Sequence, residues 1–402
     1  MRTVDELAGA LRAAAERAPL EGDLLAGVAA RRRRRNRRRL HMLAAAAAVV
    51  VLSVGVRGVV LPGESRLSGE GKVDVATPPR PTATLDRLLA KPMPVEKLWP
   101  EAVFTMPAKS ADGMRYFPVT GISATKVLVL AKPPLGKTSR IEVYDSAAKS
   151  SRVVTDLPMP HSYSEALVTT DGKNVVWYRT TTSNNGMEIW TVPLAGGKAR
   201  LVTTLSGDRG ISGIAIDGDR IVWSEWPGRA GQTPRMWHIP LTGGVPERLR
   251  TGDGLYLDTW PWGSNALPGA SDDDHNQTKV VDLRSRATFS VTVPPGTTGL
   301  RCGPRWCFGR NGTGGFLQRI DGSMVRRLDG FGGRKPVSMP PILDRFVALK
   351  NGVHDAETGR SAVINARWIS LGMLAQPSTV IYWGNKPDTY HVLNLAAVPP
   401  GQ

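Results

Sequence analysis

Short apolar segments alternate with polar and Gly-rich turns along most of the chain, from about Leu98 onward. Asn174–Tyr178 is β-branched and aromatic, and Met187–Leu194 alternates between apolar and polar positions. Alternation with a period of two predicts half-buried β-strands. With an opening strand at Ser164–Thr169 and a closing strand at Arg200–Leu205, this region forms a unit of four predicted strands.

The same unit occurs twice in succession, because residues 171–201 align with residues 217–249 at a spacing of 46 or 47. The matching pairs are Asp171 and Asp217, Trp177 and Trp223, Trp190 and Trp237, Leu194 and Leu241, and Gly196-Gly197 and Gly243-Gly244. A period of roughly 40–50 residues is typical of solenoids and propellers. Four antiparallel strands are the content of one propeller blade.

Weaker copies of the unit continue through the chain, with strands beginning near Val127, Val280, Trp306, Phe346 and Val380. Seven units over residues 98–400 give about 43 residues each, which matches the usual blade length. The sequence therefore predicts an all-β fold, a seven-bladed β-propeller. The last unit lacks an obvious fourth strand, and Leu98–Met106 is expected to supply it. Such closure removes the exposed edges of an open sheet.

An apolar run precedes this region at Leu40–Val56, with no charge apart from a possible one on His41. Adding Arg57–Leu61 lengthens it to residue 61. At 1.5 Å per residue, residues 40–61 reach about 33 Å, enough for a transmembrane helix. Arg31–Arg35 and Arg37–Arg39 precede the run and are the densest part of a net charge of +17. Such a tract could also bind nucleic acid or serve as a localisation signal. The adjacent apolar run favours a membrane flank and no nucleic-acid partner.

Arg-rich and Lys-rich segments beside a transmembrane helix stay in the cytoplasm. The chain is therefore expected to cross the cell membrane once, with residues 1–39 inside and residues 62–402 outside. Within the tail, Thr3 and Glu6 have the spacing of a capping box and predict a short helix. Residues 3–28 could dock on a cytoplasmic protein or lie near the membrane. Six prolines in residues 62–97 predict an extended stalk. A total of 43 Gly and 31 Pro suits many tight turns.

The repeated pattern of Asp-Gly, an aromatic strand and then Gly-Gly resembles TolB-like propellers, also called PD40 or WD40-like repeats. The resemblance covers residues 165–250 well and the other units loosely, and the second unit has Thr170-Asp171-Gly172 where the family usually has Pro-Asp-Gly. The order of tail, helix, stalk and propeller also resembles actinobacterial single-pass membrane proteins of unassigned role. The resemblance implies fold and topology, whereas propellers include both enzymes and scaffolds.

The two cysteines, Cys302 and Cys307, flank a Gly303-Pro304 turn in the part expected outside the membrane. An oxidising compartment favours a disulfide there. A zinc site would need four ligands, and no other Cys or His cluster lies beside them. The pair is therefore expected to link the first hairpin of one blade, with two free buried thiols as the alternative.

Catalytic signatures are absent from the sequence: it has no Gly-x-Ser-x-Gly elbow and no phosphate-binding loop. We therefore expect a non-catalytic binding, scaffolding or sensing module without a cofactor or bound metal. Its partners would be the lipid bilayer and a protein or cell-envelope glycan outside. The alternative is a propeller enzyme, a lyase or hydrolase, with its site at the central channel. Several inward Asp, Glu or His would favour the enzyme, and a lining of small and apolar residues would favour the binder.

The loops that join the second and third strands are long in four units, at 131–139, 179–187, 225–235 and 264–277. Long loops on a rigid scaffold often carry binding residues, although they can also be tolerated insertions. We expect a ligand or partner face there, formed by Trp226, Arg229, Arg235, Asp272, Asp273, Asp274 and His275. The contiguous acidic run lacks the alternating spacing of calcium loops and is read as a solvated loop.

Overall fold

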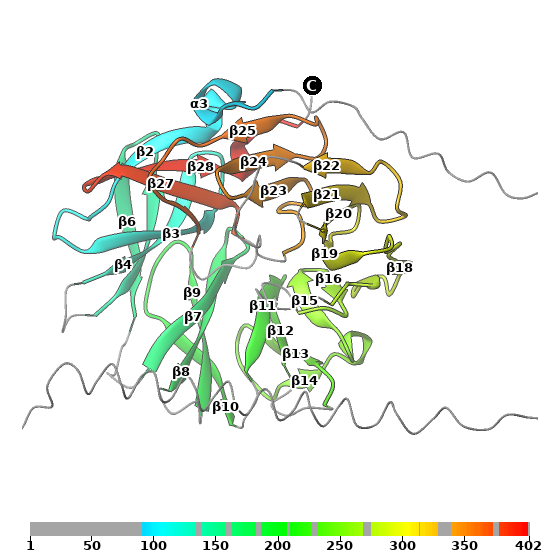
Figure 1. The fold of residues 1–402 in the computed structure, drawn as a ribbon. Helices are drawn as coiled ribbons and strands as arrows, with labels where there is room; N and C mark the ends of the chain where they lie inside the picture. The colour runs from blue at the N-terminus through cyan, green and yellow to red at the C-terminus, as the bar shows by residue number, and fades with distance from the viewer. Residues whose placement is uncertain are drawn as a thin grey trace, which may run out of the picture. The chain divides into compact units, whose positions relative to one another are not determined.

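The computed structural model describes residues 91–400, except for 134–137, 158–162, 182–185, 207–209, 227–231, 268–274, 313, 329–338 and 373–377. Within these residues the chain forms seven four-stranded sheets. Figure 1 shows them arranged around a common centre as the blades of a propeller. The fold is the predicted all-β, seven-bladed β-propeller.

Blades 1 to 5 follow the order of the chain. Blade 1 consists of β3 (Arg115–Gly121), β4 (Lys126–Lys132), β5 (Arg140–Asp145) and β6 (Ser150–Asp156). Blade 2 consists of β7 (Tyr163–Thr170), β8 (Asn174–Thr181), β9 (Gly186–Pro193) and β10 (Arg200–Ser206). Blade 3 consists of β11 (Ile211–Asp217), β12 (Arg220–Glu225), β13 (Arg235–Pro240) and β14 (Glu247–Arg248). Blade 4 consists of β15 (Tyr256–Thr259), β16 (Trp262–Ser264), β17 (Lys279–Asp282) and β18 (Thr288–Ser290). Blade 5 consists of β19 (Thr297–Cys302), β20 (Trp306–Asn311), β21 (Gly314–Arg319) and β22 (Arg326–Leu328).

The last two blades are completed by the N-terminal part of the described chain. Blade 7 joins β26 (Ile369–Leu371), β27 (Val380–Lys386) and β28 (Thr389–Asn394) to β2 (Val103–Pro107), which pairs antiparallel with β28. Blade 6 joins β23 (Phe346–Leu349), β24 (Gly352–Asp355) and β25 (Ser361–Val363) to β1 (Met93–Pro94), which pairs parallel with β25. The predicted closure of the last blade by an N-terminal strand is confirmed.

The closing segment differs in detail from the prediction for Leu98–Met106. The short helices α3 (Val95–Leu98) and η1 (Pro100–Ala102) precede β2, so the strand begins only at Val103. β1 lies in the region expected to be stalk, and it was missed because it has two residues and one is a proline. Val95 and Leu98 are buried against blades 6 and 7, which explains why this part of a Pro-rich segment packs on the propeller.

The remaining helical turns are η2 (Arg250–Gly252) and η3 (Leu395–Ala397). Among the described residues, no helix is long and apolar enough to cross a membrane. The transmembrane helix expected at residues 40–61 and the tail helix expected within residues 1–39 lie outside the described residues.

The hydrophobic core lies between neighbouring blades. Leu128 and Ile141 of blade 1 belong to the same buried cluster as Val175 and Trp177 of blade 2. The equivalent tryptophan of blade 3, Trp223, is fully buried in the next cluster along the ring. Each blade therefore buries one apolar face against each neighbour, as a propeller requires.

The repeated Gly-Gly turns join one blade to the next. Arg152 on β6 donates hydrogen bonds of 2.9 Å and 2.8 Å to the carbonyls of Leu194 and Ala195 in blade 2. Arg200 on β10 donates in the same way to the carbonyl of Leu241 in blade 3. Gly196 follows the first acceptor turn with a φ of 113°, a value that glycine adopts without a steric cost. The motif thus forms an inter-blade clasp as well as a turn.

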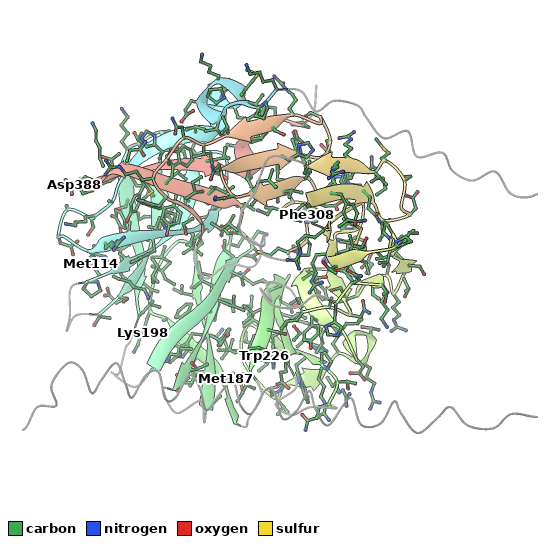
Figure 2. All side chains as sticks on the ribbon, viewed as in Figure 1. Met114, Met187, Lys198, Trp226, Phe308 and Asp388 are labelled. Carbon is green, nitrogen blue, oxygen red and sulfur yellow. A yellow bond between two sulfur atoms is a disulfide. The ribbon has the colours of Figure 1, made fainter. Side chains whose placement is uncertain are left out.

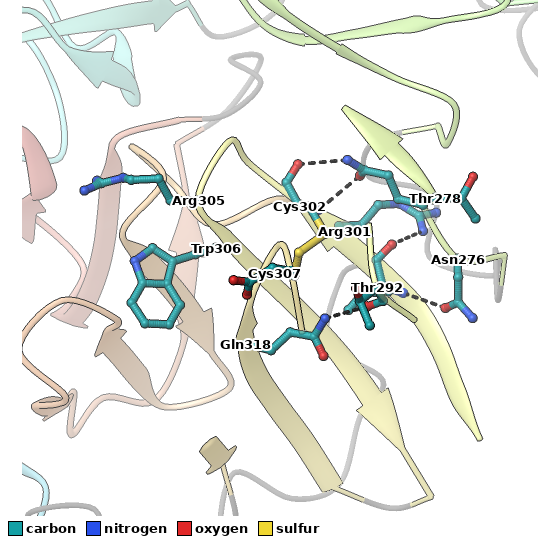
Figure 3. The surroundings of a disulfide bond; sticks show 12 residues. Asn276, Thr278, Thr292, Arg301, Cys302, Arg305, Trp306, Cys307 and Gln318 are labelled. Atoms are coloured by element: carbon teal, nitrogen blue, oxygen red, sulfur yellow. Dashed lines mark hydrogen bonds between the residues drawn. A yellow bond between two sulfur atoms is a disulfide. The ribbon is translucent and has the colours of Figure 1, made fainter. Parts of the chain in front are cut away.

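The predicted disulfide between Cys302 and Cys307 is present and links β19 to β20. Gln277 holds the same hairpin from blade 4, because its side chain accepts from the backbone N–H of Cys302 and donates to its carbonyl, both at 3.0 Å. Figure 3 shows the disulfide between Cys302 and Cys307 in its surroundings. The disulfide therefore fixes a hairpin at the seam between blades 4 and 5.

Candidate ligand-binding channel

A cavity of about 200 Å³ lies where the first strands of blades 1 to 4 end. Its lining comes from the C-terminal halves of β3, β7, β11 and β15, together with Thr379 in front of β27. Since residues from five blades contribute, blades 1 to 4 and blade 7, the cavity lies in the central channel and is made by the ring as a whole. No single repeat predicts it.

Several inner strands pair irregularly with the second strand of their blade. The register against the second strand shifts in each of β3, β7, β11, β15 and β19. In β15 the shift falls between Leu257 and Thr259, so Asp258 has no partner in the ladder. A bulge reorients the side chain at the extra residue, and bulges are frequent beside binding and active sites.

The carboxyl group of Asp258 lacks hydrogen-bond partners among the described residues. Its side chain lines the cavity and is 6% exposed. Neither carboxyl oxygen receives a hydrogen bond from the described residues. Burial raises the pKa of Asp258 to about 8, although the Ser264 hydroxyl and the Arg301 guanidinium act in the opposite direction. Ser264 lies near enough to lower this pKa, but its hydroxyl donates to the carbonyl of Ala266 at 3.1 Å, and neither oxygen of Asp258 is hydrogen-bonded within the described residues.

The indole of Trp260 also lines the cavity, and its Nε1 is buried without an acceptor among the described residues. The guanidinium carbon of Arg284 lies 5.8 Å from the ring centroid of Trp260. Arg284 in turn forms an ion pair with Asp217 at 2.7 Å. Charged groups that balance each other therefore lie around Trp260, while the buried part of the cavity holds one unpaired carboxyl.

The other lining groups are hydroxyl-bearing, small or apolar. The hydroxyl of Thr120 bonds that of Thr379 at 3.0 Å, and Thr170 donates to the carbonyl of Asn174 at 2.7 Å. Val168, Ile214 and Leu257 supply apolar surface. Apart from Asp258, none of the described residues that line the cavity is an acid, a histidine or a lysine. Among the described residues, no group of three His, Cys, Asp or Glu side chains is arranged to hold a metal ion.

Arg301 on β19 is fully buried beside the disulfide and holds the base of a long loop of blade 4. It donates to the carbonyl of His275 at 2.6 Å and to that of Leu267 at 3.3 Å. These two residues flank the segment 268–274. Of the predicted site residues in this loop, His275 therefore has a structural role through its backbone, and Asp272, Asp273 and Asp274 lie outside the described residues.

The face predicted from the long loops lies at the opposite end of the inner strands from the cavity. Trp226, labelled in Figure 2, follows β12, and its backbone N–H bonds the carbonyl of Gly210 just before β11. Its side chain is 48% exposed, as expected for a surface aromatic. Arg235 begins β13 at the same end, opposite Glu225. Arg229 lies outside the described residues.

Sequence reasoning missed Asp258. The available signal was a lone acid in an otherwise apolar stretch, Leu255-Tyr256-Leu257-Asp258. Its inward orientation depends on the bulge and on the position of blade 4 in the ring, and neither follows from the repeat pattern.

No family model matches the chain, and no curated protein matches it. Among solved structures, it is similar to the β-propeller domain of the Trilobed protease from Pyrococcus furiosus, with 11% identity, coverage of 71% of this chain and 93% of that chain, and a TM-score of 0.43. For TolB from Acinetobacter baumannii the identity is 17%, the coverage is 54% of this chain and 55% of that chain, and the TM-score is 0.34. For oligogalacturonate lyase from Vibrio parahaemolyticus the identity is 11%, the coverage is 64% of this chain and 90% of that chain, and the TM-score is 0.37. These similarities concern the fold, a propeller with TolB-like structural neighbours.

Proposed function

We propose that this protein is a membrane-anchored, non-catalytic binding module whose propeller lies outside the cytoplasmic membrane and receives its ligand in the central channel. The lining of the cavity is the observation that supports binding over catalysis. Its single carboxyl, Asp258, stands among hydroxyl and apolar groups. A lyase or hydrolase needs an acid and a base, or a nucleophile and its base, within hydrogen-bond reach. Within the described residues, no lining hydroxyl bonds Asp258 and no second acid or base stands beside it, so neither pair is assembled.

The anchoring part of the proposal rests on the sequence. The apolar run of residues 40–61 is long enough to span a bilayer, and the arginines at 31–39 favour a cytoplasmic N-terminus. The propeller follows this segment, so it would lie on the other side of the membrane.

Site-specific photo-crosslinking in native membranes tests the proposed site. A photo-reactive residue in place of Thr259, an exposed residue that lines the cavity, should yield an adduct with the ligand. The same photo-reactive amino acid in place of Trp226 tests whether the ligand binds at the long-loop face. Met324, exposed in a turn between the outer strands β21 and β22, is the matched control position.

Adducts at position 259 with a chemically unchanged molecule, and none at position 324, support a binding module at the channel. Adducts only at position 226 would move the site to the long-loop face. Repeated conversion of the captured molecule by the purified full-length protein, lost in Asp258→Asn, would establish the enzyme alternative instead.

A further inference from the structure

The cavity has a chemical requirement that the protein itself leaves unmet. Among the described residues, Asp258 is the only ionisable side chain that lines it, the side chain is buried, and neither of its oxygens has a donor. A buried carboxyl without hydrogen bonds is unfavourable, so such groups are normally paired or bound to a ligand. A partner that brings N–H or O–H donors would stabilise the carboxylate form of Asp258.

We propose that the channel cavity binds the ammonium or guanidinium end of a small organic cation, with the carboxylate of Asp258 as its counter-ion. This inference rests on the proposed binding function and names the chemical class of the ligand. The apolar walls formed by Val168, Ile214 and Leu257 contact the carbon stem of the cation.

The size and donor set of the cavity favour an organic cation over a bare metal ion. Its volume of about 200 Å³ corresponds to roughly six or seven water molecules. Calcium usually takes six to eight oxygen ligands, several of them carboxylates, whereas Asp258 is alone here. An alkylammonium group needs one carboxylate and space for its stem, and the cavity has both.

The charged groups around Asp258 are consistent with this assignment. The lining parts of β3, β7 and β11 contribute no titratable side chain, and β16 contributes only the Ser264 hydroxyl. Arg301 on β19 acts on Asp258 electrostatically, but its N–H groups donate to the carbonyls of Leu267, His275 and Leu300. The pKa of Asp258 stays at about 8 despite Arg301, so near neutral pH the carboxyl holds a proton that an ammonium group would replace.

Calorimetry with full-length protein in detergent tests the proposal, with n-butylammonium as the probe and 1-pentanol as a neutral probe of similar length. Because the carboxyl must lose its proton, the affinity for n-butylammonium should fall about tenfold for each pH unit below 8. Asp258→Asn should weaken it roughly 10- to 100-fold, the range for a hydrogen bond to a charged group. Asp253→Asn is the matched control, since Asp253 pairs with Arg248 outside the cavity.

The pH series uses only the natural protein, so it tests the assignment even if Asp258→Asn folds poorly. Equal binding of 1-pentanol, or an affinity independent of pH and of Asp258, would overturn the cation assignment while leaving a channel-binding module in place. If no probe binds at pH 9, the cation assignment is wrong. The crosslinking result at position 259 then decides separately whether the binding function also fails.

Discussion

Two buried titratable side chains give this propeller opposing responses to pH. Asp258 has a pKa raised to about 8, chiefly by burial. His354 on β24 is buried as well, bonds the Ser361 hydroxyl through Nδ1 at 2.9 Å, and has a pKa lowered to about 4, again chiefly by burial. Both groups are therefore uncharged near neutral pH, and both ionise more readily in the unfolded chain than in the folded one.

Linkage fixes the sign of each contribution to stability. For Asp258 the folded state holds the extra proton, so its contribution is complete below pH 4 and is lost as the pH rises to about 8. For His354 the unfolded state holds the extra proton, so its contribution is present above pH 6.5 and is lost as the pH falls toward 4. Each slope is about 1.4 kcal/mol per pH unit, and the two largely cancel between pH 4 and 6.5.

Urea denaturation across pH checks this balance. Relative to the natural protein, Asp258→Asn should gain free energy of unfolding between pH 4 and 8, on the order of 5 kcal/mol in total. His354→Gln should show the opposite trend. Relative to the natural protein, its free energy of unfolding should rise as the pH falls from 6.5 to 4, because only the natural protein has a histidine that must stay uncharged. A difference between Asp258→Asn and the natural protein that stays constant from pH 4 to 8 would contradict the buried, protonated carboxyl.

At the scale of the element, arginine side chains join the outer strand of one blade to a turn of the next blade. Arg152 and Arg200 occupy the first half of one outer strand and reach the turn of the next blade. Arg326 on β22 does the same toward the carbonyl of Ala356 at 2.9 Å. The repeat thus encodes an interface between blades, in addition to the strands within each one.

Removal of a clasp should loosen the contact between two blades. Arg152→Ala should lower the free energy of unfolding by about 1 kcal/mol, because two hydrogen bonds from a charged donor are lost at an exposed position. Arg220→Ala is the control, since Arg220 is half-exposed and its ion pair with Asp219 is long, at 3.9 Å, so the change should alter stability by less than about 0.5 kcal/mol. Equal effects in the two variants, measured by urea denaturation, would show that the clasp is not stabilising.

At the scale of the whole molecule, the repeated Asp171 and Asp217 turns and the repeated Trp177 and Trp223 predicted the blade and its four strands. The number of blades followed from the length of residues 98–400 and the usual blade length. Closure by an N-terminal strand was also predictable, because the last unit was one strand short. The channel site was not predictable, since Asp258 reaches it through a bulge. β1 was not predictable either, because its two residues carry no periodic signal.

The predicted topology concerns the whole molecule as well. Protease added to intact spheroplasts should cut the stalk and exposed propeller loops while leaving residues 1–39 protected, because the arginine run keeps the N-terminus inside. An epitope tag at the N-terminus reports whether residues 1–39 are protected, and a tag at the C-terminus reports whether the propeller is cut. Full protection of the propeller until the cells are lysed would place it in the cytoplasm and reject the anchoring model.

The closure of blade 7 also determines when this protein can finish folding. β2 pairs with β28, Val103 opposite Leu393, across roughly 290 residues of chain. At typical synthesis rates of about 5–20 residues per second, β2 waits roughly 15–60 s for its partner. During that time it is an unpaired apolar strand that could add to another chain. Pro94 and Pro107 stand at the two ends of the waiting segment, and because neither has an N–H, both limit premature pairing there.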